Sequence, residues 1–178
     1  MSIYIYYGRM DGSNSSKKMT LYGLKQYLSD SNMSEEFPWN KVTIAQASPH
    51  EKPFFKEYPK VFHNVSHSGD WWVCAYGSTE NGLDLQKVAH ANTRKIAVRF
   101  FHQDETSWLE GQEEEEFYRL WAYNESYVKW KGKGLTEGLS YFSVISKKKG
   151  EGLRDHWKLG VEDVCQQEIP FVEDGYYL

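Results

Sequence analysis

The sequence predicts a mixed α+β protein, and three observations support this fold class. Aromatic residues make up 16% of the 178 residues, and a high aromatic share favours sheets over a helical bundle. Two apolar runs, Ile3–Tyr7 and Trp71–Tyr76, have the β-branched and aromatic composition of strands. A third stretch, Gly111–Gly134, carries acids at its start and lysines and glycines at its end, which is typical of a helix.

The first third of the chain alternates between regular elements and polar or proline-rich loops. Apolar periodicity and turn residues predict a strand over Ile3–Tyr7, a loop over Gly8–Lys18, a helix over Leu21–Leu28 capped by Thr20, a strand over Lys41–Ala45 and an irregular stretch over Ser48–Pro59. The length of the chain suits one compact domain or two small halves that are tightly joined.

The segment Phe62–Gln86 holds the most informative chemistry. Its polar part, Phe62–Gly69, precedes the predicted buried strand Trp71–Tyr76 and contains side chains that can hold phosphate. A turn near Asn81 is the best candidate boundary between two halves. The next predicted strand, Gly82–Gln86, contains a single acid, and an aspartate inside an apolar strand is costly unless it is paired or binds a metal.

The second half of the chain is predicted to contain two helices and several short strands. Val88–Phe101 has an imperfect helical pattern, and the second helix starts near Gly111 with four consecutive glutamates in its first turn. Glu125 falls eight residues after Phe117 and therefore on the apolar stripe of that helix. Beyond the helix, the pattern predicts strands over Phe142–Ser146, Trp157–Val161, Val164–Val172 and Gly175–Leu178, the first two joined by a hairpin turn over Lys147–Gly152.

Bulk composition argues against several classes of protein. The net charge is −4, whereas a general nucleic-acid binder is usually basic. No apolar run approaches the length of a transmembrane helix, and the first residues lack the pattern of a signal peptide. The two cysteines, Cys74 and Cys165, are too few for a disulfide framework, and Cys74 is expected to be a buried thiol. We therefore expect a cytoplasmic protein that binds neither nucleic acid nor a membrane.

Asp84 and Glu125 are the main candidate pair for a metal site. Mg²⁺ is commonly held by one or two carboxylates, with phosphate and water completing its coordination shell. The alternative is structural: Asp84 would accept hydrogen bonds from the backbone, and Glu125 would pair with Lys129 one helical turn away. The residue types alone leave both interpretations open.

Ser66 and His67 are the second candidate group. A hydroxyl, an imidazole and nearby backbone N–H groups suit phosphate oxygens. The alternative is an ordinary turn before a strand, in which Asn64 and Ser66 bond the backbone, and residues of these types favour turns in any case. Lys52 and Lys129 could meet an anionic ligand, although a lysine near a helix end is usually a solvated partner of the helix dipole.

Taken in order, four sequence motifs resemble a known family. These are Lys52-Pro53, Phe62-His63-Asn64-Val65-Ser66-His67-Ser68, Gly82-Leu83-Asp84-Leu85, and Trp121-Ala122-Tyr123-Asn124-Glu125-Ser126-Tyr127-Val128-Lys129 followed by Gly132-Lys133-Gly134. Their order and spacing resemble the 4′-phosphopantetheinyl transferases of the surfactin-synthetase-activating (Sfp) type. The resemblance implies two similar α/β halves related by a pseudo-two-fold axis, here residues 1–80 and 81–178, and it implies that both ends of the fold are short.

The resemblance also implies an activity and the residues that perform it. The family transfers the phosphopantetheine arm of coenzyme A to a serine of an acyl or peptidyl carrier protein, with Mg²⁺ bound between the two halves. Carried over by motif, Asp84 and Glu125 would bind Mg²⁺, and Glu125 would also act as the base for the carrier serine. Ser66 and His67 would hold coenzyme A phosphates, Lys52 would lie near the adenine or the 3′-phosphate, and Lys129 would contact the phosphate that is transferred.

Two positions depart from the family pattern within its motifs. Gln86 stands where the family usually has a second acid; its amide oxygen could still ligate the metal, but without charge. Asn124 stands where the family has a lysine, so one positive charge is lost. These departures motivate an alternative hypothesis, in which the chain is a degenerate, non-catalytic member that binds coenzyme A or a carrier protein.

Overall fold

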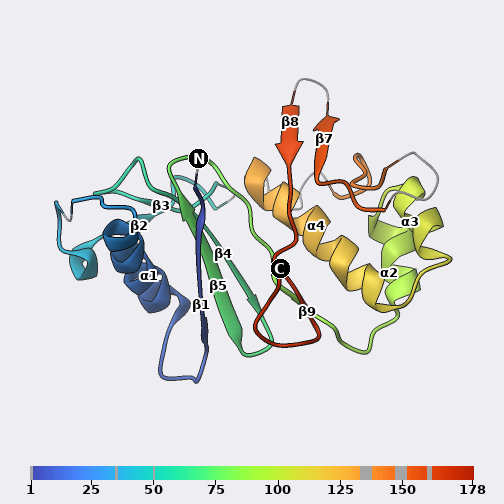
Figure 1. The fold of residues 1–178 in the computed structure, drawn as a ribbon, viewed down its shortest axis with the longest axis horizontal. Helices are drawn as coiled ribbons and strands as arrows, with labels where there is room; N and C mark the ends of the chain where they lie inside the picture. Colours follow the sequence, from blue (N-terminus) through green and yellow to red (C-terminus); the bar gives the residue numbers. More distant parts are fainter. Residues whose placement is uncertain (1, 35, 50, 133–137, 147–151, 160–161) are drawn as a thin grey trace. The chain divides into compact units, whose positions relative to one another are not determined.

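The computed structural model describes residues 2–34, 36–49, 51–132, 138–146, 152–159 and 162–178, and within these it is a mixture of helices and short strands (Figure 1). The predicted α+β composition is therefore confirmed. The chain forms two compact units: unit 1 comprises Met1–Leu83 and Lys129–Gly132, and unit 2 comprises Asp84–Val128 and Lys133–Leu178. Among the described residues, none of the helices combines the length and the apolar composition needed to cross a membrane.

Unit 1 is built on a three-stranded antiparallel sheet with the strand order β1-β5-β4. Its elements are β1 (Tyr4–Arg9), α1 (Ser16–Asp30), the short 3₁₀ helix η1 (Trp39–Lys41), β2 (Ile44–Ala45), β3 (Phe54–Phe55), β4 (Phe62–Ser68) and β5 (Trp71–Gly77). All seven residues of the central strand β5 are buried, because it is paired on both edges and covered by side chains. The strand β5 therefore fixes the position of β4.

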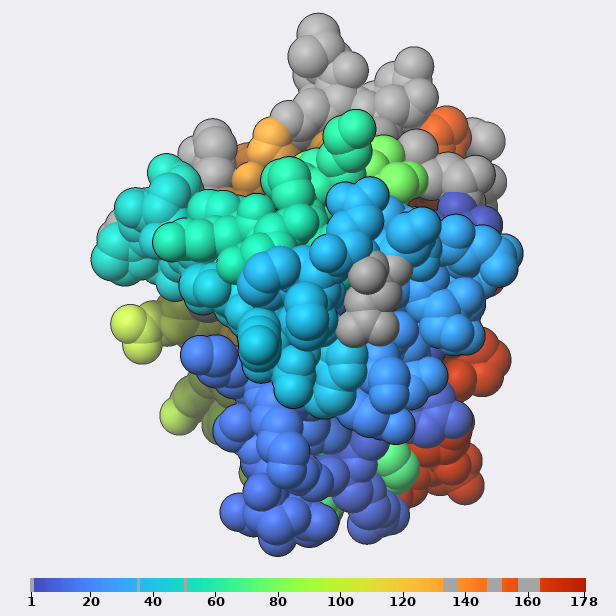
Figure 2. All heavy atoms as spheres, turned by 90° about the vertical axis from the view of Figure 1, so that its left-hand side faces the viewer, coloured from blue at the N-terminus to red at the C-terminus, as the bar shows by residue number. Residues whose placement is uncertain are grey.

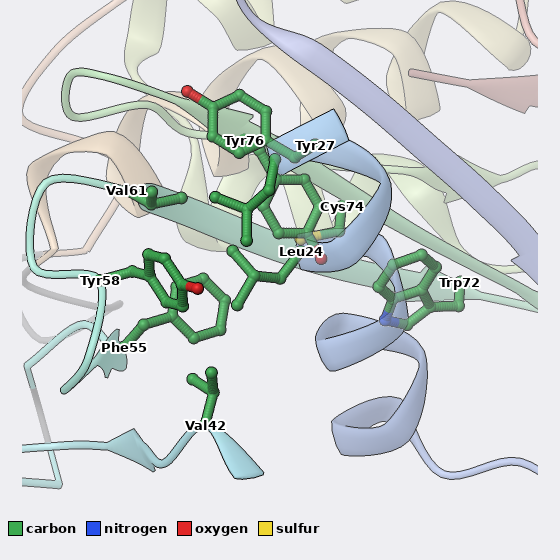
Figure 3. Packing of buried hydrophobic residues seen from close by; sticks show 10 residues of the cluster. Leu24, Tyr27, Val42, Phe55, Tyr58, Val61, Trp72, Cys74 and Tyr76 are labelled. Carbon is green, nitrogen blue, oxygen red and sulfur yellow. The ribbon is translucent and has the colours of Figure 1, made fainter. Parts of the chain in front are cut away.

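The core of unit 1 lies between α1 and the sheet. Leu24 and Tyr27 of α1 pack with Trp72, Cys74 and Tyr76 of β5 (Figure 3). The segment that follows α1 closes the cluster with Val42, Phe55, Tyr58 and Val61. On the face shown in Figure 2, α1 in blue lies beside this later segment in light blue to cyan. Cys74 is a free, buried thiol as predicted, and burial raises its pKa to about 12.

In the described parts of unit 2 there are three helices, two pairs of short strands and one isolated bridge. Its elements are β6 (Gln86–Lys87), α2 (Thr93–Phe100), α3 (Gln103–Leu109), α4 (Glu115–Lys131, whose last three residues belong to unit 1), β7 (His156–Leu159), β8 (Glu162–Cys165) and β9 (Tyr176–Tyr177). Strand β6 pairs with β9, and β7 pairs with β8, both antiparallel. The core side of α4 includes Leu120, Asn124 and Tyr127, all at most 1% exposed.

Helix α1 is longer than the predicted helix Leu21–Leu28. It starts at Ser16, because the side chain of Ser15, not that of Thr20, accepts a hydrogen bond from the backbone N–H of Lys18 at 3.2 Å. The first turn carries no apolar periodicity, so the prediction started one turn late. The polar cap residue was the signal for the true start.

Strand β4 is the largest departure from the predicted elements. The polar segment Phe62–Gly69 was predicted to precede a strand, yet Phe62–Ser68 is itself a strand and pairs with β5, with Ser66 opposite Val73. The structure thus excludes the alternative of an ordinary turn at Ser66. Pairing with a fully buried neighbour outweighs the turn preference of Asn, Ser and Gly, because strand propensity depends mainly on context.

Several predicted elements of the second half are shorter or paired differently. The predicted helix Val88–Phe101 is limited to α2 and is followed by α3, which was not predicted. The predicted strand Phe142–Ser146 is reduced to one bridge between Ile145 and Leu153. The strand β7 pairs with β8 instead, which corrects the predicted hairpin. The predicted hairpin turn falls largely on residues 147–151, which lie outside the described residues.

Replacing Gly23 of α1 by alanine is expected to destabilise unit 1 by about 2 kcal/mol. A Cβ atom at this position would lie 2.5 Å from the hydroxyl oxygen of Tyr76, which is buried and donates a 2.7 Å hydrogen bond to the carbonyl of Thr20. Overpacking costs about 1–3 kcal/mol and the lost bond about 1 kcal/mol, against a helix-propensity gain of about 1 kcal/mol. Urea denaturation measures the change.

The matched control for Gly23→Ala is Gly111→Ala, since nothing lies within 4 Å of a Cβ placed at Gly111. A double-mutant cycle with Tyr76→Phe tests the cause. Removal of the hydroxyl should recover part of the loss, and strictly additive effects would show that the clash is not the reason.

Candidate active site

In unit 1, Lys129 contacts Ser66 of strand β4, and His67 is the next residue of that strand. The ammonium of Lys129 donates a 3.0 Å hydrogen bond to the hydroxyl of Ser66, although the two residues are 63 positions apart in the chain. Loss of solvent around the His67 ring, followed by the charge of Lys129, lowers the pKa of His67 below its usual value. Both effects favour the neutral form of His67, which can offer hydrogen bonds while Lys129 supplies the positive charge.

The start of helix α1 is close to His67. Nε2 of His67 lies 2.9 Å from the hydroxyl oxygen of Ser16, the first residue of α1. The first turn of α1 contains no acidic residue, so the positive end of the helix dipole is not offset locally. The charge and the dipole both favour an anion near His67.

Lys52 lines a separate cavity of about 480 Å³ in unit 1. The wall of this cavity includes Lys52, Phe54, His63, Glu80, Trp130, Lys131 and Gly132. The Lys52 ammonium forms a 2.5 Å ion pair with Glu80 and donates a 3.0 Å hydrogen bond to the carbonyl of Asn81. Two lysines and a tryptophan around a cavity of this size suit a planar ligand that carries negative charge.

Gly132 lets Lys52 approach the end of α4. Its φ is +70°, a left-handed conformation that glycine adopts at helix ends without strain. A Cβ on Gly132 would lie 3.2 Å from Cγ of Lys52. The left-handed backbone conformation therefore favours glycine here, and a larger residue would also push the Lys52 side chain aside.

His63 is a neutral, aromatic part of the same cavity, and sequence analysis did not assign it a role there. The side chain is 5% exposed and stacks on Phe55 with ring centroids 4.2 Å apart. Burial, with a smaller effect of Lys52, lowers the pKa of His63 to about 4. Had the strand β4 been predicted, its alternation would have placed His63 and Val65 on the same face.

Asp84, Gln86 and Glu125, the predicted metal ligands, all belong to unit 2. Asp84 is 7% exposed and stands between the buried residues Leu83 and Leu85. It is not in a strand as predicted: residues 81–85 have no regular structure, and β6 begins at Gln86. Gln86 donates a 3.2 Å hydrogen bond to the carbonyl of Lys87. Within the described part of the chain, no cluster of three or more His, Cys, Asp or Glu residues is found that could hold a metal ion.

Glu125 and Lys129 lie on consecutive turns of α4. Glu125 is half-buried, and the spacing of four residues places both side chains on one face of the helix. Sequence analysis left open that Lys129 serves only to pair with Glu125. In the structure, the Lys129 ammonium contacts Ser66. At this spacing of four residues, the Cα atoms of Glu125 and Lys129 are about 6 Å apart along the helix axis.

Asn124 does not point toward solvent, and its partner Glu105 was missed by sequence analysis. Both side chains are 0% exposed, and the Asn124 amide donates a 3.1 Å hydrogen bond to Glu105. The sequence held only a partial signal for burial: Glu105 stands four residues before Leu109, on the same face of α3.

The lysine, serine and histidine of unit 1 are residue types that suit phosphate, and the carboxylates of unit 2 are residue types that suit a hard metal ion. The family model of the 4′-phosphopantetheinyl transferase superfamily matches residues 80–170. The chain belongs to this superfamily.

Known proteins with similar sequences are named 4′-phosphopantetheinyl transferases. The chain is 38% identical over 117 residues to the 4′-phosphopantetheinyl transferase ffp of Bacillus subtilis, covering 63% of this chain and 52% of that protein. It is 35% identical over 124 residues to Sfp of Bacillus subtilis strain 168, covering 67% and 55%. It is 34% identical over 120 residues to psf-1 of Bacillus pumilus, covering 64% and 51%. The chain thus spans about half the length of these relatives.

Proposed function

We propose that this chain transfers the 4′-phosphopantetheine arm of coenzyme A to a serine of an acyl or peptidyl carrier protein, with Mg²⁺. The observation that carries the proposal is the Lys129–Ser66 contact, with Glu125 one turn away on α4, in a member of this superfamily. We also propose that residues 1–80 and 81–178 correspond to the two similar halves of the family fold. Both cysteines are free thiols, which favours a reducing compartment such as the cytoplasm.

The oxygen donors of unit 2 fit Mg²⁺. Asp84 and Glu125 offer carboxylate oxygens and Gln86 an amide oxygen, and such hard ligands suit this ion, with phosphate and water completing its shell. A bound cation would also offset the cost of a carboxylate as buried as Asp84. When bound, Mg²⁺ would neutralise the pyrophosphate and stabilise charge on the leaving phosphate.

The protein residues would position the reactants and move one proton. Ser66 and neutral His67 would hold phosphate oxygens, Lys129 would neutralise the phosphate to be transferred, and Lys52 would bind the nucleotide end in its cavity. Glu125, directly or through water, would accept the proton of the carrier serine hydroxyl. The serine oxygen then forms a bond to phosphorus, the pyrophosphate P–O bond breaks, and 3′,5′-ADP leaves with the electron pair.

Mass spectrometry of a carrier protein tests this function. The carrier is incubated with the chain, coenzyme A and Mg²⁺, and a gain equal to the phosphopantetheine arm on its serine is expected. Reactions without coenzyme A, or with the carrier serine replaced by alanine, should show no gain. No gain across several acyl and peptidyl carriers would refute the proposed activity.

Gln86 favours a second candidate, a member that binds coenzyme A or a carrier without transfer. An amide brings no charge to the metal, so affinity for Mg²⁺ should be lower than with an acid at this position. Calorimetry that shows coenzyme A binding, without transfer to any carrier, would select this candidate. A large gain in rate on Gln86→Glu would point to a decayed site, and absence of coenzyme A binding would exclude both candidates.

Helix α2 presents a surface that suits an acidic carrier protein. Arg94, Lys95 and Arg99 are exposed, and Val98 and Phe100 are 67% and 41% exposed beside them. The basic residues would steer an acidic carrier toward α2, and the exposed apolar side chains would form a contact with it that excludes water. We therefore place the carrier on α2.

Reversing the charge of α2 with Arg94→Glu and Lys95→Glu is expected to raise the KM for an acidic carrier about tenfold, because steering is lost. The kcat and the affinity for coenzyme A should change by less than about twofold, since α2 would not touch the reacting atoms. Steady-state kinetics at low and high salt measure the effect, which should shrink at high salt. Lys56→Glu with Lys60→Glu, two exposed lysines of unit 1, is the matched control.

A further inference from the structure

Unit 2 contains a buried carboxyl group that the proposed reaction does not use. Glu105 of α3 is 0% exposed, and burial raises its pKa to about 7. A buried acid destabilises a fold unless its oxygens are well satisfied. An apolar residue could fill the position of Glu105 in this core, so the contacts of Glu105 must account for an acid there.

The two oxygens of Glu105 join three segments of unit 2. One accepts a 2.8 Å hydrogen bond from the backbone N–H of Val144, and the other accepts a 3.1 Å hydrogen bond from the side-chain amide of Asn124 on α4. The guanidinium of Arg154 adds a favourable charge. Helices α3 and α4 and the segment that contains Val144 are thus held at fixed distances by directional bonds.

Asn124 connects this network to the candidate metal ligand. Asn124 directly precedes Glu125 on α4, and consecutive side chains of a helix point about 100° apart around its axis. The direction of the Asn124 side chain therefore fixes the direction of the Glu125 side chain. A side chain extends about 5–6 Å from a helix axis, so a rotation of only about 20° would move its end by about 2 Å. Mg²⁺ demands near-ideal octahedral geometry, so a small rotation of α4 would misplace the Glu125 carboxylate as a ligand.

We propose that Glu105 is a positioning residue: by holding Asn124 it fixes the rotation of α4 and so directs the Glu125 carboxylate. The inference rests on the proposed function, because it takes Glu125 to be a metal ligand. It also assigns Asn124 a structural role that differs from that of a phosphate-binding lysine.

Three variants of the full chain test the proposal. Glu105→Ala removes both acceptors. Glu105→Gln keeps one acceptor for Val144, and after a flip of the Asn124 amide it can donate to Oδ1 of Asn124, a buried atom with no hydrogen-bond partner among the described residues. Leu139→Ala opens a cavity at a residue that is 1% exposed in the same unit and controls for simple loss of stability.

Electron paramagnetic resonance of Mn²⁺, alone and with coenzyme A, measures metal binding, and carrier modification measures transfer. Both are normalised to the folded fraction. Glu105→Ala should weaken Mn²⁺ binding about tenfold and raise the Mg²⁺ concentration needed for half-maximal rate, while the KM for coenzyme A stays within about twofold. Glu105→Gln and Leu139→Ala should leave both metal readouts within about threefold.

The outcomes separate this proposal from the proposed function. If the unmodified chain transfers nothing, but Glu105→Ala still weakens Mn²⁺ binding relative to Leu139→Ala, the positioning role stands and the function fails. Unchanged Mn²⁺ binding in Glu105→Ala, an equal loss in Leu139→Ala, or no Mn²⁺ binding by the unmodified chain would each overturn the positioning role.

Discussion

Replacing Glu125 by glutamine is expected to lower the rate of carrier modification about a thousandfold. Glutamine keeps the size of the side chain, but it cannot accept the serine proton and brings no charge to the metal. General-base catalysis contributes about 10²–10⁴-fold, and the lost carboxylate ligand adds to this effect. Single-turnover transfer, followed by mass spectrometry, measures the change without interference from product release.

The same variant should leave the coenzyme A contacts of unit 1 intact. Binding of coenzyme A, measured by calorimetry without metal, is expected to change by less than about threefold, because Ser66, His67 and Lys52 are untouched. Glu115→Gln, an exposed acid on the same helix, is the matched control and should transfer at the normal rate. If Glu125→Gln retained more than about a tenth of the rate, Glu125 would be neither the base nor a required ligand.

The elements that sequence analysis predicted well are those with strong local signals. The strands β1 and β5 are rich in β-branched and aromatic residues, and α4 has acids at its start, lysines in its last turn and glycine after its end. These signals act over a few residues. The strand β4 has no such signal, since only pairing with β5 makes the segment from Phe62 to Ser68 extended.

The residues of the candidate site also differ in how far the sequence alone could predict their contacts. Sequence motifs pointed to Ser66 and Lys129 separately, but their contact joins residues 63 positions apart and depends on the fold. Glu105 was missed for a different reason: an acid at an apolar spacing is normally assigned to the surface, because buried acids are rare. Its burial follows from a hydrogen-bonding partner at Asn124, which no local pattern reveals.

Two buried ionisable groups should give the two units opposite dependences of stability on pH. His63 of unit 1 has a pKa lowered from 6.5 to about 4, so its contribution to stability is present above pH 6.5 and is lost as the pH falls toward 4. Glu105 of unit 2 has a pKa raised from 4.5 to about 7, so its contribution is present below pH 4.5 and is lost as the pH rises toward 7. Each full effect is about 3 kcal/mol.

Hydrogen exchange with mass spectrometry separates the two effects, because it reports peptides of each unit. Between pH 5 and 7 the opening free energy should rise by about 2 kcal/mol for peptides of β5 and fall by about 2 kcal/mol for peptides of α4, after correction for intrinsic exchange. His63→Phe should abolish only the rise, since phenylalanine can still stack on Phe55, and Glu105→Gln only the fall. Equal slopes in both units, or a slope that survives its own substitution, would show that other groups control the pH dependence.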